Sequence, residues 1–258
     1  MAGTRSVLIS GARAPVALHM ARLLNAAGHR VTLVDHLKRP VSASGQFANC
    51  YQSIPPFTSD PEGASAALSH ILAAEDIDVV IPTCEEVLHL AALWARLRPN
   101  AGLFAPEHGL LSRAHSKHGF IRLCKEIGLP VPETHLLTSQ DALRAFRSSA
   151  GDMVFKPVWS RFGSAVLIRP RPSDLDRVRP TGAAPWVAQT YLQGREINAY
   201  AVARNGRVVA LAAYRALVRA GPGAAVCFEP ADPEPTRDFV DRFAAATAWT
   251  GQMSFDLI

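Results

Sequence analysis

The hydrophobic positions of the first third of the chain come in short runs separated by segments with a helical period. Ser6–Ser10 and Arg30–Asp35 are apolar runs of strand length. Between them, apolar residues recur on one face of a helix that Pro15 suits at its start and Gly28 at its end. The pattern predicts a strand, a helix and a second strand, with Gly11–Ala14 in the first connection.

The same alternation continues to about residue 110. It predicts a helix from Pro61, a strand at Asp78–Pro82, a helix opening with Glu85 and Glu86, and a strand at Gly102–Ala105. Strands that alternate with helices form an open parallel sheet covered on both faces. Ligands bind such sheets beyond the carboxyl ends of the strands.

Two loops are therefore expected to share one rim of this sheet: Gly11–Ala14 and Thr83–Glu86. There they could face a substrate. The two glutamates could equally serve only the helix, because its dipole favours carboxylates in the first turn. The sequence leaves both interpretations open.

A lysine occupies an unfavourable position further along the chain. Ser116–Gly128 is predicted to be a helix with an apolar face that includes Phe120 and Cys124. Lys117 falls in its first turn, where the helix dipole disfavours a cation by about 0.3–1 kcal/mol. A binding role and a structural accident both fit this position.

A second lysine lies inside the β-rich segment Met153–Arg169. The pattern predicts one strand from Met153 to Val158, a turn at Ser160–Ser164 and a second strand at Ala165–Ile168. Lys156 in the first strand must be solvated or paired with an anion, and a glycine in the turn allows backbone N–H groups to approach a phosphate. The segment is either an ordinary hairpin or a clamp on nucleotide phosphates.

A second β-rich region follows a polar connection. Trp186–Gln189 and Glu196–Ala203 read as strands, and Asn205 and Gly206 form a tight turn into another. The linker between the first two strands ends in Gly194 and Arg195. Free backbone groups in such a linker can hydrogen-bond an adenine, and a carboxylate a few residues later can hold ribose hydroxyls.

Composition restricts the function classes. The chain has 258 residues, 48% of them hydrophobic, and a formal net charge of +5. Its basic residues are scattered, which favours a small anionic ligand over nucleic acid. The four cysteines have neither the spacing of a disulfide scaffold nor that of a zinc site. No apolar run approaches the roughly 18 residues that span a bilayer, so we expect a cytoplasmic protein with no membrane partner.

Three features in this order resemble the ATP-grasp ligases together with the Rossmann-like domain that usually precedes them. They are Lys117 at the head of a helix before GLPVPET, Lys156 in FKP followed by Gly163, and the segment QTYLQGRE at Gln189–Glu196. The resemblance covers essentially the whole chain. It implies an α/β fold, with an open parallel sheet in residues 1–112 and an α+β ATP-grasp domain in residues 113–258. Within the latter it implies a small β-rich lid at about residues 134–188.

The resemblance also implies a set of site residues. Lys117 and Lys156 would contact the phosphates of ATP, and Ser160, Gly163 and Ser164 would belong to the flexible loop above them. The adenine hinge would be Gln189, Thr190 and Leu192, the ribose ligand Glu196, and the first carboxylate for Mg²⁺ Asp256. Members of the family join a carboxylate to an amine or a similar nucleophile through an acyl phosphate made from ATP. We expect small-molecule acid and amine substrates of this kind, with a homodimer left open.

Catalysis needs a cation for the substrate carboxylate, and the sequence offers Arg215 and Arg219. Both could equally be exposed arginines beside a loop, and the sequence leaves the two interpretations open. The family often has an arginine two residues before the metal-binding carboxylate, where this chain has Ser254. Relatives also continue beyond Asp256 with a strand that completes the metal site. We therefore expect these residues to be a fragment of a longer polypeptide that binds ATP more readily than it turns it over.

Two other functions remain open from the sequence. A nucleotide-binding regulatory protein could keep the ATP site without turnover. An NAD(P)-dependent oxidoreductase would use the first strand–helix–strand unit, with Asp35 as the ribose ligand. The GxGxxG fingerprint is missing there, because Ala12, Arg13 and Pro15 follow Gly11.

Overall fold

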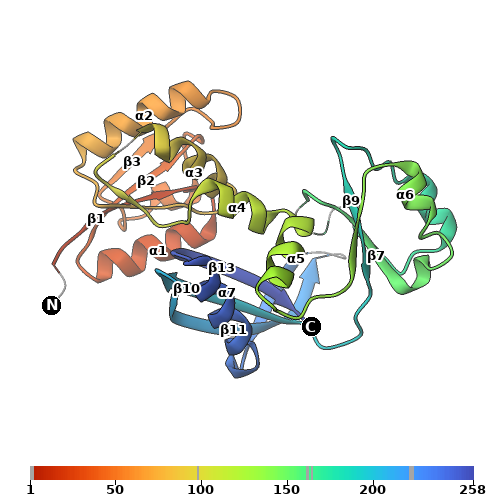
Figure 1. Ribbon diagram of the computed structural model, residues 1–258. Coiled ribbons are helices and arrows are strands. Elements are labelled where there is room, and N and C mark those ends of the chain that lie inside the picture. Colours follow the sequence, from red (N-terminus) through yellow and green to blue (C-terminus); the bar gives the residue numbers. More distant parts are fainter. Residues whose placement is uncertain (1–2, 98, 161–162, 164, 221–223) are drawn as a thin grey trace. The chain divides into compact units, whose positions relative to one another are not determined.

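A computed structural model (Figure 1) describes the chain except residues 1–2, 98, 161–162, 164 and 221–223. The chain divides into two compact units, Met1–His108 and Gly109–Ile258. Among the described residues, no helix has the length and apolar character needed to cross a bilayer.

The first unit is built on a five-stranded parallel sheet with strand order β3-β2-β1-β4-β5. Its strands are β1 (Ser6–Ser10), β2 (Arg30–Asp35), β3 (Cys50–Ser53), β4 (Val79–Ile81) and β5 (Gly102–Leu103). Its helices are α1 (Pro15–Ala26), η1 (Val41–Ser44), α2 (Pro61–Ala74) and α3 (Glu86–Leu97). The predicted open parallel sheet is confirmed, although the predicted strand Gly102–Ala105 has only two residues.

Both faces of this sheet are covered because alternate strand residues point to opposite sides. Leu8 and Val34 pack against α2 and α3, whereas Ile9 and Leu33 pack against α1. The two cores lie on either side of β1, which is paired with β2 on one edge and β4 on the other. The strand order therefore reverses between β1 and β4, where ligands of such sheets bind.

The second unit contains two four-stranded sheets. The first has order β12-β11-β10-β13, formed by β10 (Ile197–Arg204), β11 (Arg207–Ala220), β12 (Ala224–Ala231) and β13 (Gly251–Leu257). Helix α7 (Glu234–Thr247) buries Phe243 in contact with Phe255 of β13 and with Phe120 of α5 (Lys117–Glu126). The turn between β10 and β11 has positive φ at Asn205 and Gly206, as the predicted hairpin requires.

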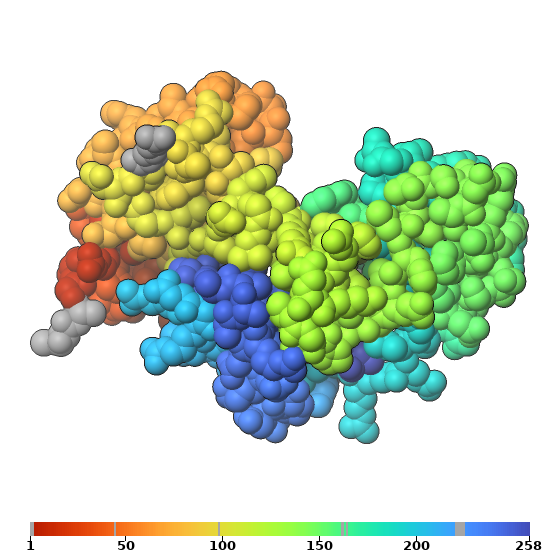
Figure 2. All heavy atoms as spheres, viewed as in Figure 1, coloured from red at the N-terminus to blue at the C-terminus, as the bar shows by residue number. Residues whose placement is uncertain are grey.

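The other sheet has order β6-β9-β7-β8 and forms the lid. Its strands are β6 (Thr134–Leu137), β7 (Met153–Pro157), β8 (Leu167–Ile168) and β9 (Trp186–Thr190), with α6 (Gln140–Arg144), η2 (Ala150–Asp152) and η3 (Pro172–Arg177). In Figure 2 the lid segments, green to teal by residue number, pack as one body. Helix α4 (His108–His115) precedes α5. The predicted α/β class with a small β-rich lid is confirmed.

One predicted strand is shorter than expected. Ala165 and Val166 lie outside β8, and Ala165 has a φ of 60°. A non-glycine residue in the left-handed region interrupts an extended strand, so hydrophobicity alone overestimated its length. The predicted loop at Ser160–Ser164 lies mostly outside the described residues, which include Ser160 and Gly163 but not Ser164.

Candidate functional site

Lys117 stands at the first residue of α5. The helix begins there because the hydroxyl of Ser116 accepts a hydrogen bond from the N–H of Gly119 at 3.1 Å. The Lys117 N–H donates to the carbonyl of Val158 at 3.2 Å, and its Nζ donates to the carbonyl of Ser160 at 2.8 Å. These two bonds tie the start of α5 to the segment that follows β7.

The side-chain ammonium group of Lys156, in β7, donates into a chain of hydrogen bonds between uncharged groups. Its Nζ donates to Oε1 of Gln189 at 2.8 Å, and Nε2 of Gln189 donates to the hydroxyl of Thr134 at 2.8 Å. The same hydroxyl donates to the carbonyl of Pro132. Thr134 therefore orients the amide that holds the lysine. Thr134 is the last residue of the quoted segment GLPVPET, but sequence reasoning gave it no role.

The charge of Lys156 is incompletely compensated. Burial lowers the pKa of its ammonium group, and the charge of Asp256 offsets this only in part. Among the described residues, no carboxylate lies within 4.0 Å of its Nζ. A largely desolvated cation without an ion-pair partner is costly in the absence of an anion. The position suits a phosphate group.

Asp256 lies in β13 opposite Asn198 in β10. Nδ2 of Asn198 donates to Oδ1 of Asp256 at 2.5 Å. Both side chains project from the sheet face opposite the buried Ala199 and Phe255. Asn198 is a second residue that sequence reasoning missed, since the register of two strands more than 50 residues apart has no local signal.

The predicted adenine hinge spans the end of β9. Gln189 and Thr190 belong to the strand, and Leu192 is exposed beyond it. The N–H of Thr190 donates to the carbonyl of Glu133, and that of Tyr191 donates to the carbonyl of Asp152. The hinge is thereby fixed to the residues that directly precede β6 and β7, and these two N–H groups are already used.

The remaining predicted residues lie along β10 and β11. Glu196, just before β10, forms an exposed ion pair with Arg219. Two irregularities in the pairing of β11 with β12 precede Arg219. Arg215 lies before them, next to Tyr214, which pairs with Asn198. Alternation puts Arg215 on the sheet face opposite Asn198, so the structure does not bring it to Asp256.

The first unit holds a separate charged cluster at the carboxyl edge of its sheet. Arg13 donates from one guanidinium nitrogen to Asp35 at 3.0 Å and to Glu86 at 2.5 Å. Both carboxylates are buried. Burial lowers the pKa of Arg13, but the hydrogen bonds and charges of Glu86 and Asp35 raise it above its usual value. Glu86 thus does more than begin α3.

This cluster joins the two loops that were expected to share a rim. The hydroxyl of Thr83 donates to the carbonyl of Ser10 at 2.7 Å. A Cβ on Gly11, which has a φ of 77°, would lie 2.3 Å from that hydroxyl oxygen, so only glycine fits. The close approach of the loops after β1 and β4 is confirmed.

Both carboxylate oxygens of Asp35 already accept hydrogen bonds from backbone N–H groups. Its Oδ2 accepts from the Arg13 N–H at 2.7 Å, and its Oδ1 accepts from the Leu37 N–H at 3.1 Å. A carboxylate held at both oxygens is poorly placed to bind a ribose, which argues against the NAD(P) hypothesis. Asp35, His36 and Glu86 are also close enough to share a metal ion, but Arg13 supplies the positive charge between the two carboxylates.

Comparison with solved structures identifies the architecture. No family model matches the chain, and no curated protein matches its sequence. An N5-carboxyaminoimidazole ribonucleotide synthetase in complex with ADP superposes over 99% of this chain with a TM-score of 0.73 and 17% identity. The chain has the ATP-grasp fold. The family resemblance read from the sequence is thus confirmed at the level of the fold.

Two further ATP-grasp structures are similar. An L-amino acid ligase from Bacillus licheniformis is 14% identical over 100% of this chain, with a TM-score of 0.73. The biotin carboxylase domain dimer of the Hydrogenobacter thermophilus 2-oxoglutarate carboxylase, in complex with MgADP, ADP and bicarbonate, is 13% identical over 99%, also with a TM-score of 0.73. This chain spans 67%, 64% and 61% of the three proteins' own chains.

Proposed function

We propose that the chain carries the ATP-binding part of a ligase that joins a carboxylate to an amine or a similar nucleophile, releasing ADP and phosphate. The main supporting observation is the position of Lys156. It is a desolvated cation held by a neutral amide, with the carboxylate of Asp256 near enough to affect its pKa. A cation with a carboxylate nearby is what a complex of phosphate and Mg²⁺ requires.

The two lysines would have complementary roles. Lys117 and Lys156 come from different elements, so together they can fix phosphate oxygens in more than one direction. Gly163, with a φ of 66°, would let the loop after β7 approach the phosphates, together with Ser160 and Ser164. Gln189 would keep the Lys156 head in place, and ATP would supply the transferred phosphoryl group.

The other predicted residues would orient the nucleotide and the acid. Thr190 and Leu192 would line the adenine, and Glu196 would accept from the ribose hydroxyls. Asp256 would hold Mg²⁺, and Oδ1 of Asn198 offers a further oxygen, since Nδ2 already donates to the aspartate. Of the two arginines suggested for the substrate carboxylate, the geometry favours Arg219 over Arg215.

The proposal is tested by measuring ADP release from the full-length protein with ATP and pairs of amino acids. We expect ADP to form only when an acid and an amine are both present, and Lys156→Met to abolish it. The control is Lys125→Met, which removes an exposed lysine from the last turn of α5. ATP binding without ADP release from any pair would favour the regulatory alternative. Failure to bind ATP would overturn the proposal.

A further inference from the structure

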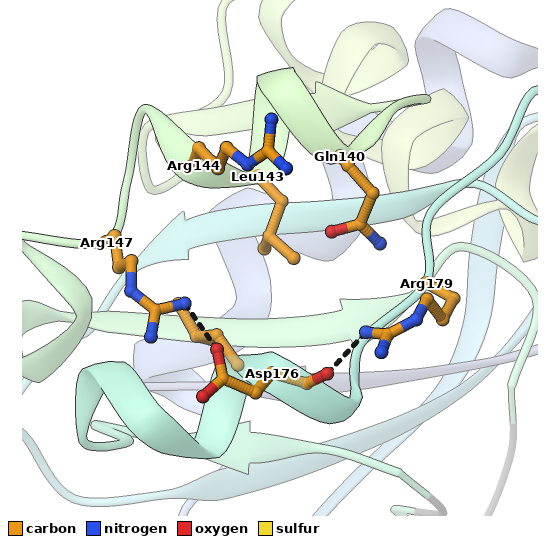
Figure 3. Close-up of a pocket in the computed structure, with 7 residues that line it drawn as sticks. Gln140, Leu143, Arg144, Arg147, Asp176 and Arg179 are labelled. Atoms are coloured by element: carbon orange, nitrogen blue, oxygen red, sulfur yellow. Dashed lines mark hydrogen bonds and ion pairs between the residues drawn. The ribbon is translucent and has the colours of Figure 1, made fainter.

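The lid contains a cavity on the side away from Lys156. Its volume is about 400 Å³, and it is lined by Gln140, Leu143, Arg144, Arg147, Leu175, Asp176 and Arg179. Figure 3 shows it between α6 and η3, with Arg147 and Arg179 approaching Asp176 from opposite sides. Pockets for small molecules usually enclose about 300–1,000 Å³, so the space suits one compact ligand.

The cavity is distinct from the candidate ATP site. Leu143 and Leu175 at its base belong to the core formed with Phe155 of β7. Phe155 and Lys156 are successive strand residues and point to opposite faces of the lid sheet. The sheet therefore separates the cavity from the lysine that is proposed to bind phosphate.

The walls are held together by contacts that use only part of each polar group. One nitrogen of Arg147 donates to Asp176 at 2.6 Å, and one nitrogen of Arg179 donates to backbone carbonyls of Asp176 and Val178. Nε2 of Gln140 donates to the carbonyl of Val178 at 2.8 Å. Within the described part of the chain, the other guanidinium nitrogens of Arg147 and Arg179 have no partner.

The charge of the lining is positive. It contains three arginines and one aspartate. The hydrogen bond from Arg147, with the charges of Arg147 and Arg179, lowers the pKa of Asp176 and keeps it ionised. Arg144 uses one nitrogen for Asp141 in its own turn. Guanidinium groups with spare N–H donors bind phosphate and carboxylate oxygens in pairs.

We propose that this cavity is a second ligand site, which binds a compact anion carrying a phosphate or a pair of carboxylates. Arg147 and Arg179 contact the anion, and Arg144 contributes from the rim. Gln140 offers a ligand hydroxyl its amide oxygen, which accepts no hydrogen bond from the residues that the structure describes. A ligand here connects α6 to η3 on the outer face of the lid.

The test uses inorganic phosphate and malonate as probes, in the Lys156→Met background so that binding at the ATP site is not counted. Arginine Nε–H resonances are followed by NMR during each titration. The signals of Arg147 and Arg179 should shift saturably, whereas that of Arg171, which pairs with Asp174 outside the cavity, should not. Saturation by phosphate alone or by malonate alone would identify which kind of anion binds.

The variants Arg147→Gln and Arg179→Gln should each weaken binding about tenfold, and Arg171→Gln should leave it unchanged. If either variant unfolds, Arg144→Gln is the substitute. Among the described residues its only ion pair is with Asp141 in its own turn, and the change should weaken binding about threefold. Equal shifts at all arginines, or no saturable shift, would overturn the proposal. Neither result depends on ligase activity.

Discussion

The two units each contain a partly buried cation, and the two cations are compensated in different ways. Arg13 lies between two buried carboxylates, at 3.0 Å from Asp35 and 2.5 Å from Glu86. Lys156 has a neutral amide oxygen of Gln189 at 2.8 Å instead. Correspondingly, the pKa of Arg13 is raised by its partners, whereas that of Lys156 is lowered by burial.

We propose that this difference separates a structural cation, Arg13, from a ligand-binding one, Lys156. A buried charge that already has its counterions contributes to the fold, and removing it strands those counterions. A desolvated charge without a counterion reduces stability, so its presence is better explained by a ligand. On this argument, Arg13 holds the loops after β1 and β4 together, and we propose that Lys156 binds phosphate.

The largest expected effect is on stability, in Arg13→Met. This change leaves Asp35 and Glu86 buried and unpaired, and we expect the free energy of unfolding of the first unit to fall by about 3 kcal/mol. Urea unfolding measures it. Arg5→Met, which removes an exposed ion pair to Asp78, should cost less than about 1 kcal/mol. Equal losses in the two variants would show that the cluster is not structural.

In contrast to Arg13→Met, the variant Lys156→Met should reduce ATP affinity and not the free energy of unfolding. We expect ATP to bind about 10- to 100-fold more weakly, since a charge-assisted hydrogen bond to phosphate is lost. The free energy of unfolding should stay the same or increase, because a desolvated charge is removed. Calorimetric titration with ATP and urea unfolding measure the two quantities. Unchanged ATP affinity with reduced stability would make Lys156 a structural residue like Arg13.

The pH dependence should have opposite signs for stability and for binding. The pKa of Lys156 is lower in the folded protein than the ordinary value of 10.5, so the unfolded chain binds more protons between the two values. Stability attributable to this lysine therefore rises with pH across that window. ATP affinity should fall over the same window, because the ammonium group is lost.

The measurement is the difference between the wild-type protein and Lys156→Met at each pH. Subtraction is needed because burial raises the pKa of Cys124 from 9.0 to about 12, which lowers stability as pH rises above 9.0. A difference in stability that does not change with pH would contradict the desolvated state of Lys156.

Much of the fold could be predicted from local pattern. The bounds of β1 and β2 agree with the predicted strands Ser6–Ser10 and Arg30–Asp35, because apolar runs flanked by turn residues report burial directly. The strand β3, Cys50–Ser53, was missed. Its sequence CYQS has little apolar character, and its side chains are only partly buried, so only its pairing with β2 defines it.

The site could be predicted less completely. Lys156 could be proposed as a candidate from the sequence because a charge inside an apolar strand is locally anomalous. Its support by Gln189 and Thr134 depends on the pairing of β9 with β7 and β6, and the contact between Asn198 and Asp256 depends on that of β10 with β13. Such long-range pairings are set by tertiary packing and leave no mark on the sequence near either residue.

The smallest expected effect concerns the ion pair between Arg219 and Glu196. It is solvent-exposed, so Arg219→Gln should change the free energy of unfolding by less than about 1 kcal/mol. If Glu196 accepts from the ribose hydroxyls, the arginine competes for its carboxylate. Arg219→Gln should then strengthen ATP binding relative to 2′,3′-dideoxy-ATP by about two- to fivefold.

The ratio of the two affinities cancels the general effect of losing a positive charge near the triphosphate, because that loss weakens the binding of both nucleotides alike. Glu196→Gln should reduce the ratio to near one, and adding Arg219→Gln to it should have no further effect on the ratio, because the competing carboxylate is gone. If Glu196→Gln leaves the ratio unchanged, Glu196 does not bind the ribose and serves only the ion pair with Arg219. In that case Glu196 and Arg219 would resemble the compensated cluster of the first unit, and the ribose would need another acceptor.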